Sequence, residues 1–292
     1  GGDIPALYDA LSSAIAAARA GEGAQMVHVR VPRLTGHNWQ DPAAYKTAEE
    51  KEEDRRRDPL ARLIDWLTRE RSVPQSRIEE MQAAATDFAR EQADAAWNQG
   101  RDPQPSDALT HLFAPAQPIP DTPPLTEGPR LTMQQAIGKA LADEMGRDPS
   151  ILVFGEDVGA FGGVHRVTDG LQTRFGEARC FDTSLSEEGI VGRSVGMAAN
   201  GLRPVPEIQF RKYADPAHEQ ITDAGSLRWR TNGRFGGPIV LRIPVGYQLM
   251  GGDPWHAVTG EAVFAHLPGW KIAYPSNAAD AVGLLRAALR GA

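Results

Sequence analysis

The sequence predicts an α/β fold in which a doubly wound parallel sheet follows a mostly helical segment. In the second half of the 292-residue chain, short apolar runs alternate with stretches of helical periodicity. Repeated units of this kind form parallel sheets that are covered by helices on both faces. The first hundred residues carry mainly helical patterns, and a proline-rich stretch separates the two halves.

The first part of the chain, residues 1–102, is expected to be mostly helical. Asp3 and Asp58 are good N-caps, and a proline follows Asp58 at the helical position that tolerates it best. The charged run at 49–57 is read as a solvated segment. The expected elements are, in order, a helix from Asp3 to about Gly21, a strand at 27–31, a polar loop from Pro32 to Arg57, a helix that begins at Asp58-Pro59, and a helix from about 76 to 98.

Residues 103–130 are read as a semi-rigid, extended linker. Eight prolines crowd into this stretch, and proline removes the backbone donors on which regular helices and strands depend. The alternative is a proline-rich ligand for a small recognition domain. No lysine or arginine lies among these prolines before Arg130, which favours the linker.

The second part, residues 131–292, alternates helices and strands. Thr132 and Gln135 form a capping box at the start of its first helix, and the apolar run that follows is typical of a buried parallel strand. The expected elements are, in order, a helix from 132, a strand at 151–154, a helix at 186–200, a strand at 204–210, a helix that begins at Asp215-Pro216, strands at 238–243 and 271–274, and a helix at about 277–288.

Three polar side chains lie at or just beyond the predicted ends of strands, namely Glu156, Glu187 and Gln209. Open parallel sheets bind their ligands at the carboxyl ends of strands. Ser186 is a good N-cap, so Glu187 falls in the first turn of a helix, where an acid often serves only the helix dipole. For Glu156 alone, a solvated turn acid remains an equal alternative.

Two loop histidines are candidates for acid/base chemistry. His256 lies in a glycine-rich loop beside Trp255, and His37 lies in the polar loop of the first part. For both, simple exposure is the alternative reading. No cluster of histidine, cysteine and acidic residues has the spacing of a metal site, and the glycines at 155–163 do not have dinucleotide-binding spacing.

Composition excludes several classes of function. The net charge of −7 and the pI of about 5.6 argue against a nucleic-acid partner. No apolar run approaches the roughly 20 residues of a membrane helix. The single cysteine, Cys180, cannot form an internal disulfide, which suits a cytoplasmic protein. Both termini look cut, so we expect the chain to be a piece of something longer.

Three segments in order, Gly155-Glu156-Asp157-Val158, Leu185-Ser186-Glu187 and Gly201 to Tyr213, resemble one known family. They are similar to the pyrimidine-binding domain in the β subunit of thiamine-diphosphate-dependent 2-oxoacid dehydrogenases, a transketolase-like domain. Residues 1–98 resemble the tail of the α subunit, with the loop from Arg33 to Asp41 as its active-site loop. The chain therefore looks like an α–β fusion, with residues 131–292 as the β-type pyrimidine-binding domain.

The resemblance implies a decarboxylating component that acts on a 2-oxoacid and passes the acyl group to a lipoyl arm on a partner acyltransferase. Its cofactors would be thiamine diphosphate and Mg²⁺, with the family's G-D-G diphosphate motif expected before residue 1. The fragment is then expected to be inactive alone, and the fused chain to form a homo-oligomer or an α2β2-like assembly. The implied site residues are Glu187, His256 and His37 for catalysis, and Tyr213, Gln209, Leu185, Glu156 and Arg33 for cofactor binding and proton relay.

Three departures from the family pattern bear on this interpretation. Asn38 follows His37 where serine is common, so phosphorylation cannot occur there, and Ala257 and Pro32 also replace usual residues. The alternatives are a transketolase-like transfer of sugar fragments and a non-catalytic fragment that only assembles with a partner. We also expect the loop from Arg33 to Arg57 to be mobile without cofactor, because it is long and polar.

Overall fold

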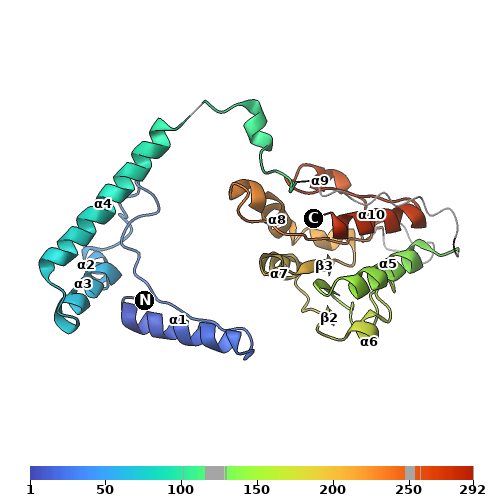
Figure 1. Ribbon diagram of the computed structural model, residues 1–292, viewed down its shortest axis with the longest axis horizontal. Coiled ribbons are helices and arrows are strands. Elements are labelled where there is room, and N and C mark those ends of the chain that lie inside the picture. Colours follow the sequence, from blue (N-terminus) through green and yellow to red (C-terminus); the bar gives the residue numbers. More distant parts are fainter. Residues whose placement is uncertain (101, 116–127, 129, 247–253, 257, 292) are drawn as a thin grey trace. The chain divides into compact units, whose positions relative to one another are not determined.

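The computed structural model describes residues 1–100, 102–115, 128, 130–246, 254–256 and 258–291. Its two compact units, residues 1–102 and 103–292, are considered separately and are called the N-terminal and C-terminal units (Figure 1). In the part of the chain that is described, no helix has both the length and the apolar composition needed to span a membrane.

Within residues 1–100, the N-terminal unit has four helices, two of which begin at predicted caps. The Asp3 carboxylate accepts a hydrogen bond from the amide of Ala6 at 3.0 Å, and Asp58 accepts one from Leu60 at 2.8 Å. Each bond satisfies an amide that the start of a helix leaves unpaired. The helices are α1 (Ile4–Arg19), α2 (Ala48–Arg56), α3 (Pro59–Glu70) and α4 (Gln75–Asn98).

Two predictions for this unit are wrong. Residues 27–31 do not form a strand, because a strand needs a hydrogen-bonded neighbour and residues 1–100 provide none. The stretch from Pro32 to Arg57 is not an unstructured loop, because α2 occupies most of its second half. Thr47 and Glu50 begin α2 with a capping box, whose Thr-x-x-Glu spacing the sequence displays within a charged run.

The C-terminal unit is built around a parallel sheet. Thr132 and Gln135 form the predicted capping box of its first long helix. Its elements are η1 (Pro105–Leu109), α5 (Met133–Arg147), β1 (Ile151–Gly155), α6 (Leu171–Phe175), β2 (Cys180–Asp182), α7 (Glu187–Ala199), β3 (Arg203–Glu207), η2 (Arg211–Ala214), α8 (His218–Arg230), α9 (Glu261–Ala265) and α10 (Ala278–Arg290).

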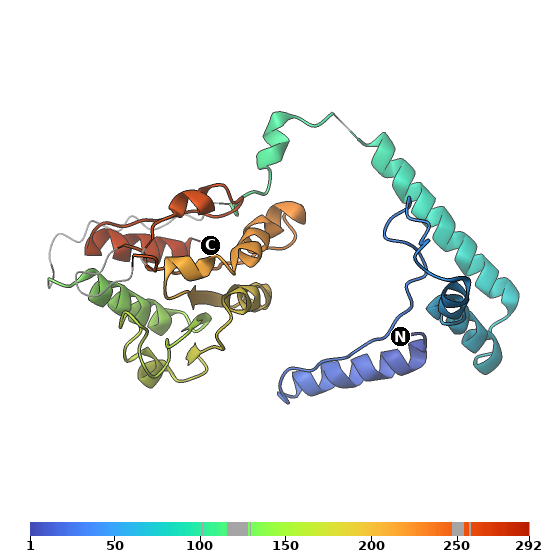
Figure 2. The same ribbon diagram turned by 180° about the vertical axis from the view of Figure 1, so that it is seen from behind.

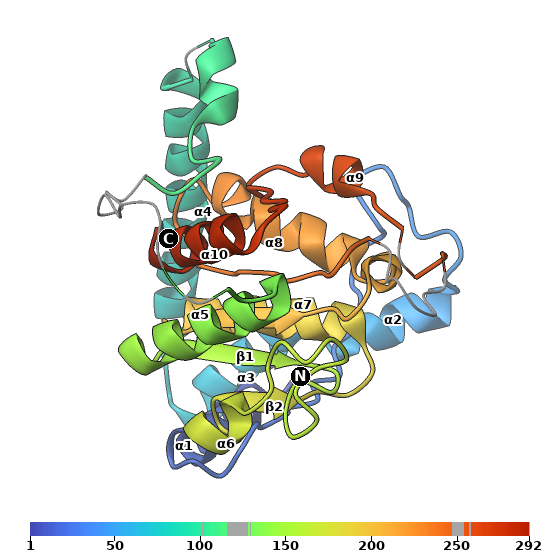
Figure 3. The same cartoon turned by 90° about the vertical axis from the view of Figure 1, so that its right-hand side faces the viewer.

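Helices cover both faces of this sheet, as the doubly wound prediction requires. The strand order is β2-β1-β3, with every neighbouring pair parallel. Because side chains alternate along a strand, Ile151 and Val153 pack with α5 and α10, whereas Leu152 and Phe154 pack with α7. Figure 3 shows α5 and α10 side by side, and Figure 2 shows α8 beside α7, against which it packs as a further layer.

Two of the predicted strands in this unit are not formed as expected. Residues 238–243 run beside β3, with the amides of Val240 and Arg242 bonded to Pro204 and Pro206, but they make only one isolated bridge, at Arg242. Residues 271–274 form no strand, because no described segment pairs with them. Strand β3 ends at Glu207, earlier than predicted, and the helix expected at Asp215-Pro216 begins at His218.

Part of the predicted linker at 103–130, namely residues 116–127 and 129, lies outside the described residues and stays a prediction there. Its first part contradicts the expectation that prolines exclude regular helix, because η1 forms a short 3-10 helix at Pro105–Leu109. Pro105 stands at the start of η1, where its missing amide hydrogen costs no hydrogen bond. This piece of the stretch belongs to the C-terminal unit.

Candidate functional site

The carboxyl ends of the three strands lie level with one another. Gly155 of β1 is in register with Asp182 of β2 and with Glu207 of β3. A Cβ atom on Gly155 would lie 2.4 Å from the carbonyl oxygen of Glu207, so glycine permits this close approach. Glu156 follows β1 directly, and Gln209 follows β3 after one further residue. The structure therefore brings these predicted site residues to one edge of the sheet.

Glu156 and Gln209 are joined by a hydrogen bond across this edge. The amide Nε2 of Gln209 donates to Oε2 of Glu156 at 2.7 Å. Glu156 is buried, and its Oε1 has no partner among the described residues. Burial raises the pKa of Glu156; the bond from Gln209 opposes that rise, and the negative charges of Glu187 and Asp157 add to it. Glu156 is therefore suited to hold a proton that an exposed glutamate would release.

Glu187 is the first residue of α7, and it lies close enough to Glu156 for its negative charge to raise the pKa of Glu156. The Ser186 hydroxyl accepts a hydrogen bond from the amide of Gly189 at 3.3 Å, so the predicted N-cap is present. Glu187 is half-buried, whereas Glu188 beside it is exposed. This difference distinguishes a carboxylate that faces the strand ends from one that only meets the helix dipole.

Tyr213 and His256, which are 43 residues apart in the sequence, meet in a cluster of aromatic rings. The Tyr213 hydroxyl and Nε2 of His256 share a hydrogen bond of 2.6 Å. The centroid of the Phe210 ring lies 5.0 Å from that of His256 and 5.8 Å from that of Tyr213. The Trp255 ring contacts the rings of Tyr213 and His256. Leu185, also a predicted site residue, is 81% exposed and stands apart from this packing.

The sequence did not identify His165, which supports the same site. Its Nε2 lies 3.1 Å from the carbonyl oxygen of Gln209. A carbonyl oxygen only accepts, so this nitrogen of His165 carries the hydrogen. The bond holds the backbone of the residue whose side chain contacts Glu156, and the His165 ring meets the edge of Phe210 at 5.3 Å. Nothing in the loop sequence signals a contact 44 residues away.

A buried ion pair between Glu207 and Arg242 lies at the end of β3. The Glu207 side chain is 1% exposed and that of Arg242 is 11% exposed. Oε1 of Glu207 has no partner among the described residues. Burial, followed by the charges of Asp182 and Glu207, raises the pKa of Cys180 to about 12, so this thiol stays protonated and inert. Glu207 and Arg242 each interrupt an apolar run, and this pattern is the sequence signal that could have revealed the ion pair.

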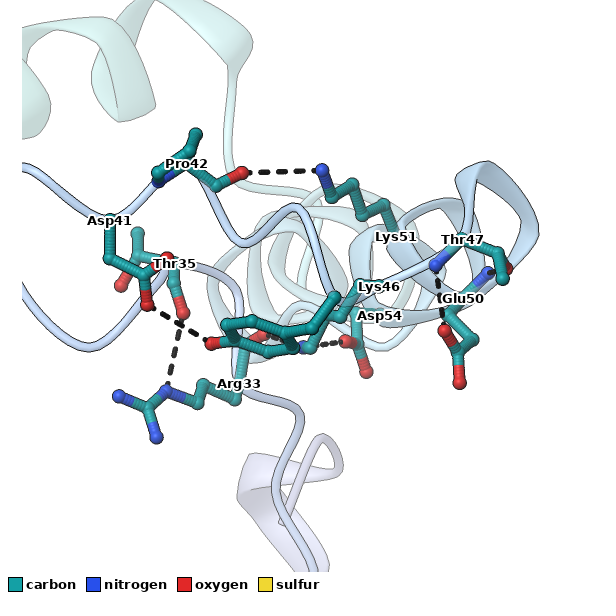
Figure 4. Close-up of polar contacts among 10 residues, drawn as sticks. Arg33, Thr35, Asp41, Pro42, Lys46, Thr47, Glu50, Lys51 and Asp54 are labelled. Atoms are coloured by element: carbon teal, nitrogen blue, oxygen red, sulfur yellow. Dashed lines mark hydrogen bonds and ion pairs between the residues drawn. The ribbon is translucent and has the colours of Figure 1, made fainter.

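In the N-terminal unit, the loop that carries Arg33 and His37 has a hydrogen-bonded structure of its own (Figure 4). Asp41 accepts bonds from the amides of His37 at 2.6 Å and Ala43 at 2.8 Å, and from the Tyr45 hydroxyl at 3.2 Å. The backbone bond from His37 is the largest of the effects that lower the pKa of Asp41. The loop is therefore arranged around one carboxylate.

The same loop is tied to α2 by Lys46. Its ammonium donates to the carbonyl oxygen of Arg33 and to the carboxylate of Asp54, each at 2.6 Å (Figure 4). The Lys46 and Asp54 side chains are both 19% exposed, so the pair is partly shielded from water. Arg33 and His37 themselves are exposed, and their side chains are accessible to a ligand. The expectation that cofactor orders this loop stays a prediction.

The described residues of both units offer no group of three or more histidine, cysteine and acidic side chains that could hold a metal ion. The strand-end site instead offers carboxylates, an amide and aromatic rings. This set can bind a flat heterocycle by stacking and by hydrogen bonds, and it can move a proton. The assigned roles of the individual residues stay predictions.

Parallel α/β sheets with polar groups at their strand ends are a class of ligand-binding domain. The chain belongs to the family described as "Transketolase, pyrimidine binding domain", whose model matches residues 130–292, more than half of its length. A second model, "Dehydrogenase E1 component", matches residues 1–105. These matches agree with the predicted family, and with a parallel sheet that follows a helical region.

Named relatives agree with the family models. The chain is 47% identical over 160 residues to the 2-oxoisovalerate dehydrogenase subunit beta of Pseudomonas aeruginosa, covering 54% of this chain and 45% of that protein. It is 46% identical over 160 residues to the pyruvate dehydrogenase E1 component subunit beta of Acholeplasma laidlawii, covering 54% and 49%. The chain thus spans about half the length of the curated relatives it matches.

Proposed function

We propose that this chain forms part of a thiamine-diphosphate-dependent 2-oxoacid dehydrogenase, in the component that decarboxylates the 2-oxoacid. The observation that carries the proposal is the meeting of Glu156, Gln209 and Glu187 at the level strand ends of a transketolase-type pyrimidine-binding domain. The match of residues 1–105 to a dehydrogenase component supports it. So do the names of the relatives, which include 2-oxoisovalerate and pyruvate dehydrogenases.

The residues at the strand ends fit the aminopyrimidine ring of thiamine diphosphate. That ring presents amino and ring-nitrogen groups, and Glu156 has a buried oxygen without a partner among the described residues. Tyr213 offers a half-buried ring for stacking, and Gln209 offers an amide. When bound, the cofactor supplies the electron sink that decarboxylation of a 2-oxoacid needs.

The chain's own residues would bind, orient and exchange protons. Glu187 would hydrogen-bond the aminopyrimidine ring and exchange a proton with it, and Leu185 with Gln209 would border that ring. Glu156 would hold the relayed proton, because burial raises its pKa. His256 would act as acid or base beside the reacting carbon, with its ring oriented by the 2.6 Å bond to Tyr213.

Arg33 and His37 would contact the diphosphate. A guanidinium and an imidazole are both donors to phosphate oxygens, and charge-assisted bonds of this kind are strong. The network around Asp41 and Lys46 fixes the backbone from which these two side chains project. The ligands of the Mg²⁺ that would accompany the diphosphate are expected outside this sequence.

The acyl product would pass to a lipoyl arm on an acyltransferase, and the fused chain would assemble as a homo-oligomer or an α2β2-like complex. The word component in the name of the second family model and in the name of the Acholeplasma laidlawii relative supports a multienzyme partner. A cytoplasmic location stays a prediction, as does the choice among branched-chain 2-oxoacids, pyruvate and other substrates.

Two assays on the intact protein, supplied with thiamine diphosphate and Mg²⁺, separate this proposal from its alternatives. We expect dye reduction that depends on a 2-oxoacid, and no transfer of a two-carbon unit between ketose and aldose phosphates. Ketose transfer in place of dye reduction would establish the transketolase-like function. Absence of both activities, with calorimetry that detects no cofactor binding, would identify a non-catalytic assembly fragment.

A further inference from the structure

We propose that residues 105–113 are a docking segment that anchors the stretch between the two units onto the C-terminal unit. The inference does not depend on the proposed function. The family models end at residue 105 and resume at residue 130, so most of this segment lies outside both. Its contacts with the C-terminal unit are therefore an added feature of this chain.

The first contact joins η1 to α8. The indole Nε1 of Trp229 donates to the carbonyl oxygen of Ala108 at 3.1 Å, between residues 121 apart in the sequence. A short 3-10 helix leaves its last carbonyls without partners inside the helix. Trp229 satisfies one of them, the carbonyl of Ala108.

The second contact places His111 on the turn after α8. His111 has a φ of 64°, in the left-handed region that side chains rarely adopt. A Cβ atom on Gly233 would lie 2.7 Å from Nδ1 of His111, so the ring can sit there only because residue 233 is glycine. An unusual backbone conformation persists only when its surroundings hold it. The imidazole is thus fitted to this turn.

The third contact lies at the end of the segment, where the Lys271 ammonium sits 5.5 Å from the centroid of the Phe113 ring. This is within the range of a cation–π interaction. The docking face therefore consists of Trp229, Gly233 and Lys271, drawn from α8, the turn after it and the stretch after α9. Three contacts of different kind along nine residues indicate a specific docked segment.

The occupant of the docking face is the chain's own segment, because Trp229 is bonded to its Ala108 and Lys271 lies over the ring of its Phe113.

Hydrogen exchange on the full chain tests the proposal through the amides of Thr110 and Leu112, which are bonded to Asp107 and Leu109. Gly233→Ala should raise the exchange rates of these two amides about tenfold, because the segment would lose the stabilisation of roughly one hydrogen bond. The matched control is Gly201→Ala, because Gly201 has a similar φ of +82° but nothing within 4 Å of an added Cβ.

Trp229→Phe keeps a ring and removes only the donor, so it should raise the same exchange even if Gly233→Ala disturbs the fold. Exchange in α5 should not change in either variant, since α5 makes no docking contact. Unchanged exchange at Thr110 and Leu112 in both variants would overturn the proposal. Protection in the wild type that weakens on dilution would also overturn it, because the docked segment would then come from a second copy.

Discussion

Replacing Arg242 with methionine should destabilise the C-terminal unit strongly. The substitution leaves the Glu207 carboxylate, which is 1% exposed, without its ion-pair partner. The other oxygen of Glu207 already has no partner among the described residues, so the whole charge would be buried and uncompensated. Breaking a buried pair in this way costs about 3–5 kcal/mol.

The expected change is large enough for calorimetry. The unit spans residues 103–292, and for a domain of this size about 1 kcal/mol lowers Tm by roughly 2–4 °C. The transition of this unit should therefore move down by about 6–20 °C in Arg242→Met.

Arg230→Met is the matched control. Arg230 forms an ion pair with Asp223 at 2.7 Å in the same unit, but both side chains are more than half exposed. Such a pair contributes about 0–1 kcal/mol, so its Tm should move by a few degrees at most. Adding Glu207→Met to Arg242→Met should restore part of the loss. Equal Tm shifts in Arg242→Met and Arg230→Met would refute the reasoning.

Two further predictions concern carboxylates whose pKa is shifted. The pKa of Glu156 is raised above 4.5, so the wild-type protein loses stability as the pH rises from 4.5 through the pKa of the folded state. Glutamine does not titrate, so the Tm of Glu156→Gln relative to that of the wild type should rise across the same pH window. A Tm difference that stays constant with pH would contradict this prediction. Asp41 has a pKa below 3.8, so its support of the loop is present above 3.8 and lost as pH falls through the lowered value. At neutral pH, Asp41→Asn should speed hydrogen exchange at residues 37–45, and Asp65→Asn on α3 should not. Bound thiamine diphosphate should slow exchange at 33–45 in the wild type, and equal rates would exclude ordering by cofactor.

Several helix starts and the end of the first strand could be predicted because they depend on local chemistry. Asp3, Thr132 and Ser186 cap helices through bonds to amides three residues away, so the sequence contains both partners. The strand-end position of Glu156 follows from one apolar run and the rule for parallel sheets. These features need no knowledge of distant contacts.

Features that depend on distant partners were missed or predicted wrongly. The alternating valines at 27–31 look like a strand, but residues 1–100 supply no neighbouring strand. The bond from His165 to the backbone of Gln209 joins residues 44 apart, and the pair of Glu207 with Arg242 joins residues 35 apart. The capping box that begins α2 was readable at Thr47, but the charged composition of the segment favoured a solvated loop.

The most direct test of the central claim compares kcat for Glu187→Gln and Glu188→Gln in the intact protein, assayed with a 2-oxoacid, thiamine diphosphate and Mg²⁺. Both substitutions remove one charge from the first turn of α7, but only Glu187 is half-buried toward the strand ends. Loss of a proton-transfer group should lower kcat about 10²-fold or more in Glu187→Gln. Glu188→Gln should stay within about twofold of wild type, because its effect is confined to the helix dipole. Near-normal turnover in Glu187→Gln, or equal losses in the two variants, would contradict the role assigned to Glu187.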